Sequence, residues 1–409
     1  MADNNQNMRS HVICFNGGSS SIKVAVKEVT GTEVQSIADF NCQGLGTPGG
    51  YVDVVVSGKK DRWEMVMDDH SSALHAITKI ISKDFPDLNI VAVGHRVVHG
   101  GTYFTDSALI DGVEGKVQAE ILRLSALAPL HNPANHQIII AALKDEVFGK
   151  VPNVAVFDTQ FHANMPKYAQ YYGVPKNWIT DYSILRYGFH GTSYEYITGR
   201  FAELNNIARE ATNVVIAHLG NGCSMAKVQN GIGSDTSMGV TPLAGLIMGT
   251  RSGDVDPGML ELMAEKLDVD VKEIVRILNR ESGAWGLYSK GTKEIYQIRE
   301  AAQNGDADAE LVLDVIAYRV AKYFSEYLGT MEDPQGIVFT GGVGENEGYV
   351  RSKVLGFMKM FKWNIDTETI LTRNEEVIIA ESDLIPGLKA WVIPTDEERV
   401  FALEAMRFC

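Results

Sequence analysis

The chain has 409 residues, of which 45% are hydrophobic, so it is long enough for two globular domains that each bury a core. Its 52 acidic residues outnumber its 37 basic residues and give a formal net charge of −15, which disfavours nucleic acid or an anionic membrane as a partner. The four cysteines lack metal or redox spacing, no signal peptide or membrane-spanning run is visible, and we therefore expect a cytoplasmic protein with reduced thiols.

The first predicted element is a β-hairpin, with apolar strands at 12–15 and 24–26. Between them, residues 16–23 read Asn-Gly-Gly-Ser-Ser-Ser-Ile-Lys. Glycine lets the backbone approach a ligand closely, and serine hydroxyls and backbone N–H groups bind phosphate oxygens. Taken alone, the turn favours an ordinary tight hairpin with small turn residues, so the phosphate interpretation needs further support.

The next segments alternate between strand and helix patterns. A G-x-G-x-x-G match at 44–49 is rejected as a dinucleotide site, because it contains Pro48 and leads into a strand at 51–57. The periodicity then predicts the following order of elements: helix 71–85, strand 90–93, helices 116–128 and 133–147, and strand 154–157. This alternation predicts an α/β fold, in which the polar residues that follow the strands line the ligand crevice.

A tyrosine- and proline-rich region at 163–186 marks the predicted domain boundary. A helix follows, with Thr192 and Glu195 spaced as a capping box. Residues 214–228 then repeat the design of the first hairpin, an apolar strand, a glycine-rich turn and a second strand, and Gly220 takes the place of Gly18. Two such hairpins predict a duplicated domain, whose two turns grip a nucleotide from both sides.

The last part of the chain contains further glycine-rich turns. Asp256 and Pro257 are predicted as the N-cap and N1 residues of a helix. The patterns after them predict helices at 270–279 and 306–330, a buried strand at 336–340, and strands at 377–380 and 390–393. Thr395 and Glu398 are spaced as a capping box for the terminal helix.

Taken together, the ordered motifs closely resemble acetate kinase. They are N-G-G-S-S-S-I-K at 16–23, G-H-R-V-V-H-G-G at 94–101, A-P-L-H-N-P at 128–133, F-D-T-x-F-H at 157–162, F-H-G-T-S at 189–193, H-L-G-N-G at 218–222, T-R-S-G-D-x-D-P at 250–257, T-G-G-V-G-E-N at 340–346 and T-D-E-E at 395–398. The resemblance implies the superfamily of sugar kinases, heat-shock chaperones and actin. The expected fold is thus α/β, with two duplicated actin-like ATPase domains that contain ribonuclease H-like sheets and enclose a cleft. The expected domains are 1–160 with 395–409, and 161–394.

The activity implied by the resemblance is transfer of the γ-phosphoryl group of ATP to acetate, which gives acetyl phosphate and ADP without a phosphoenzyme. Phosphoryl transfer depends chiefly on positioning and charge stabilisation. The resemblance implies Mg²⁺ or Mn²⁺ as cofactor, and we expect a homodimer. Two alternatives stay open at this point: a propionate kinase on the same scaffold, and a nucleotide-binding module without catalytic activity.

The resemblance also assigns roles to individual residues. Arg96 and Arg251 are expected to bind the carboxylate and the transferring phosphoryl group, since a guanidinium fork binds such oxygens bidentately. His190 and Asn221 are expected to contact the transferring group. The metal is expected to be held by Asp158 and Glu397 with Asn16. As plain structural residues, the arginines would form salt bridges, and Glu397 would stabilise a helix N-terminus.

Two further sets of residues are implied by the resemblance. The acetate methyl group is expected to lie among Val98, Leu130, Phe189 and Pro242. The nucleotide is expected to contact Asn16, Ser19, Ser21, Lys23, His131, His218, Leu219, Gly220, Asn221, Gly222, Gly341, Gly342, Val343, Gly344 and Asn346. The sequence departs from the family at 290–298, where Glu294 and Tyr296 stand in place of the usual Asp and Arg beside the base. It also departs at Tyr194, where the family usually has His, and at Gly17, where Ala or Cys is commoner.

Overall fold

The computed structural model describes residues 9–18, 21–56, 58–129 and 131–409. The chain divides into two compact units, Met1–Gln160 with Asp396–Cys409 and Phe161–Thr395, which we call the first and second units. Ser19 and Leu130, two predicted site residues, lie outside the described residues. Among the described residues, no helix has both the length and the apolar character needed to cross a bilayer.

The first unit is built on an eight-stranded sheet in the order β5-β4-β3-β2-β1-β6-β8-β7. Its strands are β1 (Ser10–Gly17), β2 (Ser21–Thr30), β3 (Glu33–Gln43), β4 (Tyr51–Val56), β5 (Lys59–Glu64), β6 (Ile90–Val97), β7 (Ala108–Leu109) and β8 (Asn153–Phe157). Strands β1 to β5 pair in antiparallel fashion, whereas β1, β6 and β8 run parallel. The carboxyl ends of these three parallel strands therefore meet at one edge.

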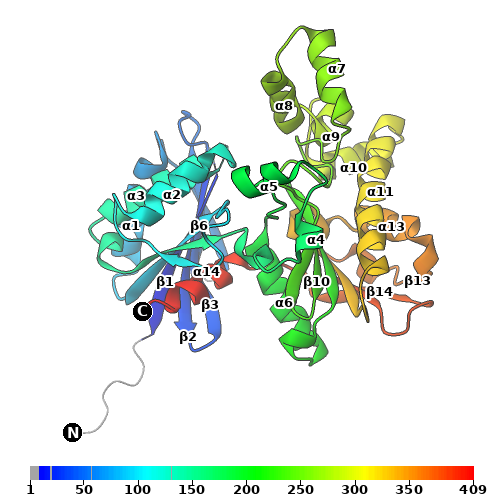
Figure 1. The fold of residues 1–409 in the computed structure, drawn as a ribbon. Helices are drawn as coiled ribbons and strands as arrows, with labels where there is room; N and C mark the ends of the chain where they lie inside the picture. The colour runs from blue at the N-terminus through cyan, green and yellow to red at the C-terminus, as the bar shows by residue number, and fades with distance from the viewer. Residues whose placement is uncertain (1–8, 19–20, 57, 130) are drawn as a thin grey trace. The chain divides into compact units, whose positions relative to one another are not determined.

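Both faces of this sheet are covered, as the two-residue period of β1 requires (Figure 1). Ile13 and Phe15 pack in one core with α1 (His70–Asp84) and α3 (Asn132–Lys144). Val12 and Cys14 point to the other face and pack with α14 (Glu397–Met406). The terminal helix, red in Figure 1, thus belongs to the first unit. Helix α2 (Lys116–Arg123) is followed by a 3-10 turn at Leu124–Ala126.

The second unit repeats this plan in a seven-stranded sheet with the order β11-β10-β9-β12-β15-β14-β13. Its strands are β9 (Val214–Leu219), β10 (Cys223–Gln229), β11 (Ile232–Thr236), β12 (Gly336–Thr340), β13 (Trp363–Ile365), β14 (Val377–Ser382) and β15 (Lys389–Val392). In both sheets, the first strand of the glycine-turn hairpin pairs antiparallel with the second strand and parallel with a later strand. The predicted duplication of the hairpin is therefore confirmed.

Helices also surround the second sheet. Tyr194, Ile197 and Phe201 of α6 pack against strand residues such as Val338. The other helices are α4 (Lys167–Gln170), α5 (Lys176–Tyr182), α7 (Gly258–Leu267), α8 (Val271–Arg280), α9 (Gly283–Leu287), α10 (Ile295–Gln303), α11 (Ala307–Gly329), α12 (Gly341–Asn346) and α13 (Gly348–Phe357). Helix α6 spans Gly191–Asn205.

The predicted capping box at Thr192 and Glu195 is wrong. Helix α6 begins at Gly191, and its N-cap is His190, which makes no side-chain capping hydrogen bond. Thr192 is therefore inside the first turn and is buried, while Glu195 forms an ion pair with Arg209. The helix starts earlier than predicted because His190 itself adopts a left-handed conformation, with φ of 56°, at the helix entrance.

Two other helix starts differ from their predictions by one residue. The N-cap of α14 is Asp396, whose carboxylate accepts a hydrogen bond from the Arg399 N–H at 3.0 Å, so Thr395 is not the cap. The N-cap of α7 is Pro257 rather than Asp256. Asp256 Oδ1 nevertheless accepts a hydrogen bond from Gly258 N at 2.9 Å, and thus satisfies a helix N–H group as a cap does.

Candidate functional site

The first glycine-rich turn connects β1 to β2 and is held against α3. A Cβ at Gly17 would lie 1.9 Å from Ile138 Cδ1, so with glycine here the Ile138 side chain packs directly against the backbone of β1. Gly18 N donates to Ser21 O at 2.9 Å, and the Gly18 carbonyl lies 2.8 Å from His70 Nε2. The carbonyl groups of Gly18 and Ser21 are thus bound by protein groups.

Three predicted site residues of the first unit meet in one cluster. The Arg96 guanidinium binds Asp158 bidentately through one edge, with Nε donating to Oδ1 at 2.9 Å and Nη2 donating to Oδ2 at 2.7 Å. Its third nitrogen, Nη1, donates to Asn16 Oδ1 at 2.9 Å. Arg96 lies in β6, Asn16 lies in β1, and Asp158 directly follows β8, so the parallel register brings the three to the same sheet edge.

The charge around Arg96 is predominantly negative. The Asp158 carboxylate is only 1% exposed. Burial disfavours the charged guanidinium, but Asp158, Glu397 and Glu398 outweigh that effect and raise the pKa of Arg96 above its ordinary value. Lys23 Nζ binds Glu398 Oε1 at 2.8 Å, so a phosphate contact of Lys23 would require this ion pair to open. Glu397, in the first turn of α14, thus adds its charge to the same cluster.

The donor set of this cluster fits a hard divalent cation. Asp158 and Glu397 supply carboxylate oxygens, and Asn16 supplies an amide oxygen, which are the ligands that Mg²⁺ and Mn²⁺ prefer. Over the described ranges, no group of three or more His, Cys, Asp or Glu side chains is arranged to hold a metal ion by itself. A metal ion that is held by one or two carboxylates and by substrate phosphates needs no more protein ligands than Asp158, Glu397 and Asn16.

His95, the neighbour of Arg96, makes the stability of the protein depend on pH. Its ring is 1% exposed and stacks on Phe15, and burial lowers its pKa from 6.5 to about 4. Between these two values the unfolded chain binds a proton that the folded chain does not bind. We therefore expect the free energy of unfolding to fall by about 3 kcal/mol for this residue as the pH decreases from 6.5 to 4.

The pH prediction is tested by urea unfolding at a series of pH values, with His95→Gln beside the wild type. The free energy of unfolding of the variant should decrease less between pH 6.5 and pH 4 than that of the wild type, because the glutamine side chain does not titrate. Replacement of the exposed His75 serves as the control. An unchanged slope in His95→Gln would contradict the assignment. His162 in the second unit, also buried with a pKa lowered to about 4, should account for part of the remaining slope.

In the second unit, the predicted histidines form a stacked pair. The rings of His190 and His218 lie 4.3 Å apart with an interplanar angle of 19°. His190 Nδ1 lies 2.7 Å from Ser224 Oγ, which in turn contacts the Tyr194 hydroxyl. His218 Nδ1 lies 2.8 Å from Ser193 Oγ. Hydroxyl groups therefore fix both rings at Nδ1, and Tyr194 takes part in this network.

His190, Asn221 and Arg251 converge on the second glycine-rich turn. A Cβ at Gly222 would lie 3.1 Å from Arg251 Nη2 and 3.5 Å from His190 Nε2. Arg251 Nη1 donates to the Pro242 carbonyl at 2.6 Å. The Asn221 carbonyl accepts from Gly249 N at 3.0 Å, which ties the turn to the loop that carries Arg251. The second unit thus groups its predicted catalytic residues around one turn.

The segment Gly341–Asn346, which contains five of the predicted nucleotide-binding residues, forms α12 directly after β12. Gly341 has φ of +75°, and a Cβ there would lie 2.9 Å from the Leu219 carbonyl, so this segment adjoins the second glycine-rich turn. Glu345 Oε1 accepts hydrogen bonds from Gly341 N at 2.8 Å and from Thr395 N at 3.1 Å. The fully buried Arg351 donates to Gly344 O at 2.8 Å.

The predicted acid-pocket residues are divided between the units. Val98 follows β6 in the first unit and is 4% exposed. Phe189, 1% exposed, and the half-buried Pro242 belong to the second unit. His131 is the N-cap residue of α3 in the first unit. In the departing segment 290–298, Glu294 is the N-cap of α10 and Tyr296 is 46% exposed.

Five residues that hold the glycine-rich turns, His190 or α12 in place were not predicted from the sequence: His70, Asn135, Ser224, Glu345 and Arg351. Glu345 lies inside a quoted motif, so its position was a usable signal. The other four act through contacts with other secondary-structure elements, and no local sequence pattern marks them.

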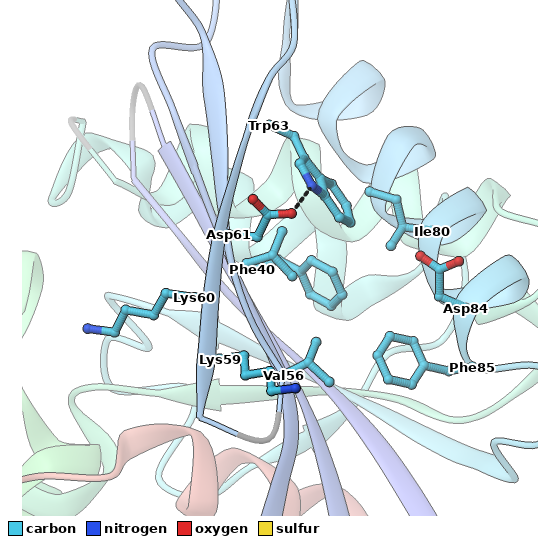
Figure 2. Close-up of a pocket in the computed structure, with 10 residues that line it drawn as sticks. Phe40, Val56, Lys59, Lys60, Asp61, Trp63, Ile80, Asp84 and Phe85 are labelled. Carbon is cyan, nitrogen blue, oxygen red and sulfur yellow. Dashed lines mark hydrogen bonds between the residues drawn. The ribbon is translucent and has the colours of Figure 1, made fainter.

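A separate pocket lies on the first unit, between β4, β5 and the end of α1 (Figure 2). It has a volume of about 640 Å³, and its walls are chiefly apolar core side chains with charged residues at the rim. It is lined by Phe40, Val54, Val56, Lys59, Lys60, Asp61, Trp63, Ile80, Asp84 and Phe85. None of these residues belongs to the predicted site, and the Trp63 indole N–H is already bound to Asp61. We assign no reaction to this pocket.

The chain is similar to known proteins over nearly its whole length. Residues 11–403 match the model of the acetokinase family. The acetate kinase of Thermosipho africanus is 40% identical over 403 residues, covering 96% of each chain. The crystal structure of Porphyromonas gingivalis acetate kinase has a TM-score of 0.86 at 35% identity and covers 97% of this chain and 99% of that one. A propionate kinase from Francisella tularensis has a TM-score of 0.89 at 34% identity, with the same coverage.

The matched range, residues 11–403, extends through both units. The α/β fold expected from the sequence is therefore confirmed as the actin-like ATPase fold of the acetate and propionate kinases. Because the family model and the relatives cover the chain almost from end to end, the chain belongs to the acetokinase family.

Proposed function

We propose that this protein is an acetate kinase that transfers the γ-phosphoryl group of ATP to acetate and forms acetyl phosphate and ADP. The observation that carries the proposal is the Arg96, Asp158 and Asn16 cluster at the sheet edge, in a chain of this family. A binding module has no need of a guanidinium placed to bind a carboxylate.

In the proposed reaction, the acetate carboxylate attacks the γ-phosphorus in line, and the bond to the β-γ bridging oxygen breaks. Arg96 and Arg251 hold carboxylate and phosphoryl oxygens, which lowers the charge repulsion between the two anions. The His190 ring is fixed by the contact of its Nδ1 with Ser224, and its Nε2 donates to the transferring phosphoryl group. The Asn221 amide donates to the same group. Asn16, Asp158 and Glu397 would hold Mg²⁺, which neutralises phosphate charge when bound.

The proposal is tested by a hydroxamate assay, which traps acyl phosphates, with several nucleotides and short carboxylic acids. We expect a signal that requires acetate, ATP and a divalent cation together. Hydrolysis of ATP at the same slow rate with and without acetate would instead support a nucleotide-binding module.

Two further parts of the proposal are a homodimer and a cytoplasmic location. The cytoplasmic location is supported by the four cysteines, which form no disulfide.

Propionate is the alternative acid, because the solved structure of a propionate kinase is as similar to this fold as that of an acetate kinase. We expect acetate to be preferred in the wild type, and Val98→Ala to enlarge the pocket by two methyl groups. The ratio of kcat/KM for propionate to that for acetate should rise about tenfold, as one methylene group in an apolar pocket is worth about 1–3 kcal/mol.

The matched control is Val97→Ala, which removes the same atoms next along the chain from a side chain that packs with Phe157 in the core. This variant should lose stability but keep the acetate preference. If both variants change the acid preference equally, Val98 does not line the acid pocket.

A further inference from the structure

One buried amide connects two segments of the proposed site. Asn135, in the first turns of α3, is 1% exposed. Its Nδ2 donates to the Gly17 carbonyl at 3.0 Å, and its Oδ1 accepts from the Val98 N–H at 3.2 Å. Gly17 belongs to the first phosphate turn, whereas Val98 belongs to the loop that follows Arg96. The same side chain therefore holds the nucleotide segment and the acid segment.

Other contacts show that the start of α3 is a fixed support. Asn132 is fully buried, donates to the His99 carbonyl at 3.1 Å, and accepts from the His99 N–H at 3.1 Å. Ile138, one turn after Asn135, fills the space beside Gly17. Both loops are thus attached to one helix, and α1 adds a third attachment through His70 and Gly18.

We propose that Asn135 is a positioning residue that couples binding of the nucleotide to binding of the acid. The proposal rests on the proposed function, which places ATP at the first turn and acetate beside Val98. The Asn135 amide has one donor edge, which binds the Gly17 carbonyl, and one acceptor edge, which binds the Val98 N–H. A movement of Gly17 on phosphate binding therefore moves the amide, and with it the Val98 backbone.

The most informative variant is Asn135→Asp, because the aspartate side chain has the same shape as that of asparagine. Its carboxylate can still accept from the Val98 N–H, but it has no donor for the Gly17 carbonyl and places negative charge against that oxygen. The matched control is Ile139→Val on the same helix, whose side chain packs with Val97 and Phe157 in a different core cluster. The control lowers stability without altering the amide.

The experiment measures calorimetric binding of a non-hydrolysable ATP analogue with magnesium, with and without saturating acetate. In the wild type, acetate should tighten analogue binding at least fivefold. In Asn135→Asp this ratio should fall close to one, and analogue binding without acetate should weaken about tenfold. Ile139→Val should lower the melting temperature but keep the wild-type ratio.

The inference is overturned if Asn135→Asp keeps the wild-type ratio, if the wild type shows no coupling, or if Ile139→Val loses coupling equally. Failure of the proposed function is recognised separately, because the wild type would then form no acyl phosphate from acetate. In that case, unchanged analogue binding by Asn135→Asp in the absence of acid would also overturn the role of Asn135.

Discussion

Arg251→Ala is expected to lower kcat by about three orders of magnitude while the protein stays folded, since an arginine that stabilises a transferring phosphoryl group is worth about 10³–10⁵ in rate. In the structure, Arg251 is attached by a hydrogen bond to the Pro242 carbonyl, and its Nη2 faces Gly222 beside His190. Loss of that hydrogen bond should cost only about 1 kcal/mol of stability. The measurement is steady-state formation of acyl phosphate together with thermal unfolding.

Arg251→Lys and Arg276→Ala provide the controls for this result. The lysine variant keeps the charge but loses the planar fork, so its kcat should lie between those of the wild type and Arg251→Ala. Arg276 is paired with Glu273 on the exposed surface of α8, and its removal should leave kcat unchanged. Near-full activity in Arg251→Ala would refute the assigned role.

Arg96→Ala is expected to abolish measurable activity and also to destabilise the first unit. Asp158 is 1% exposed, and both of its carboxylate oxygens are bound by Arg96. Removal of the guanidinium leaves a buried carboxylate without its partner, which typically costs about 3–5 kcal/mol. Asn16 also loses a donor to its amide oxygen. The measurement is urea unfolding at pH 7, combined with the acyl phosphate assay.

The double variant Arg96→Ala with Asp158→Asn separates stability from catalysis. Removing the buried negative charge should restore much of the lost stability, because the unpaired carboxylate is the cause of the loss. Activity should stay absent, since both the acid-binding and the proposed metal-binding groups are missing. If Arg96→Ala alone is as stable as the wild type, the ion pair is not the support that the geometry indicates.

The sequence predicted those parts of the fold whose signals are local. The two hairpins were predicted because apolar strands flank glycine-rich turns, and α11 because its apolar positions recur with helical spacing. Strand β5 was not predicted, since its residues are mostly exposed and polar at a sheet edge. Helix starts were wrong where a neighbouring residue took the cap, as Asp396 did in place of Thr395.

The site was predictable where a motif carries the chemistry. Asn16, Arg96 and Asp158 were named from three separate motifs, and the structure brings them together. The ion pair between Arg96 and Asp158 and the hydrogen bond from Arg96 to Asn16 were not predicted, because these contacts depend on the register of three strands. The roles of Asn135 and Arg351 could not be predicted from the sequence either, because both side chains bind backbone groups of other segments.

The central claim, that Arg96 and Arg251 act on the same phosphoryl transfer, is tested most directly by a crystal structure with magnesium, acetate and a non-hydrolysable ATP analogue. We predict that both guanidinium groups lie within hydrogen-bonding distance, about 3 Å, of acetate or γ-phosphate oxygens. A structure in which the ligands are bound while either guanidinium contacts only protein groups would contradict this account.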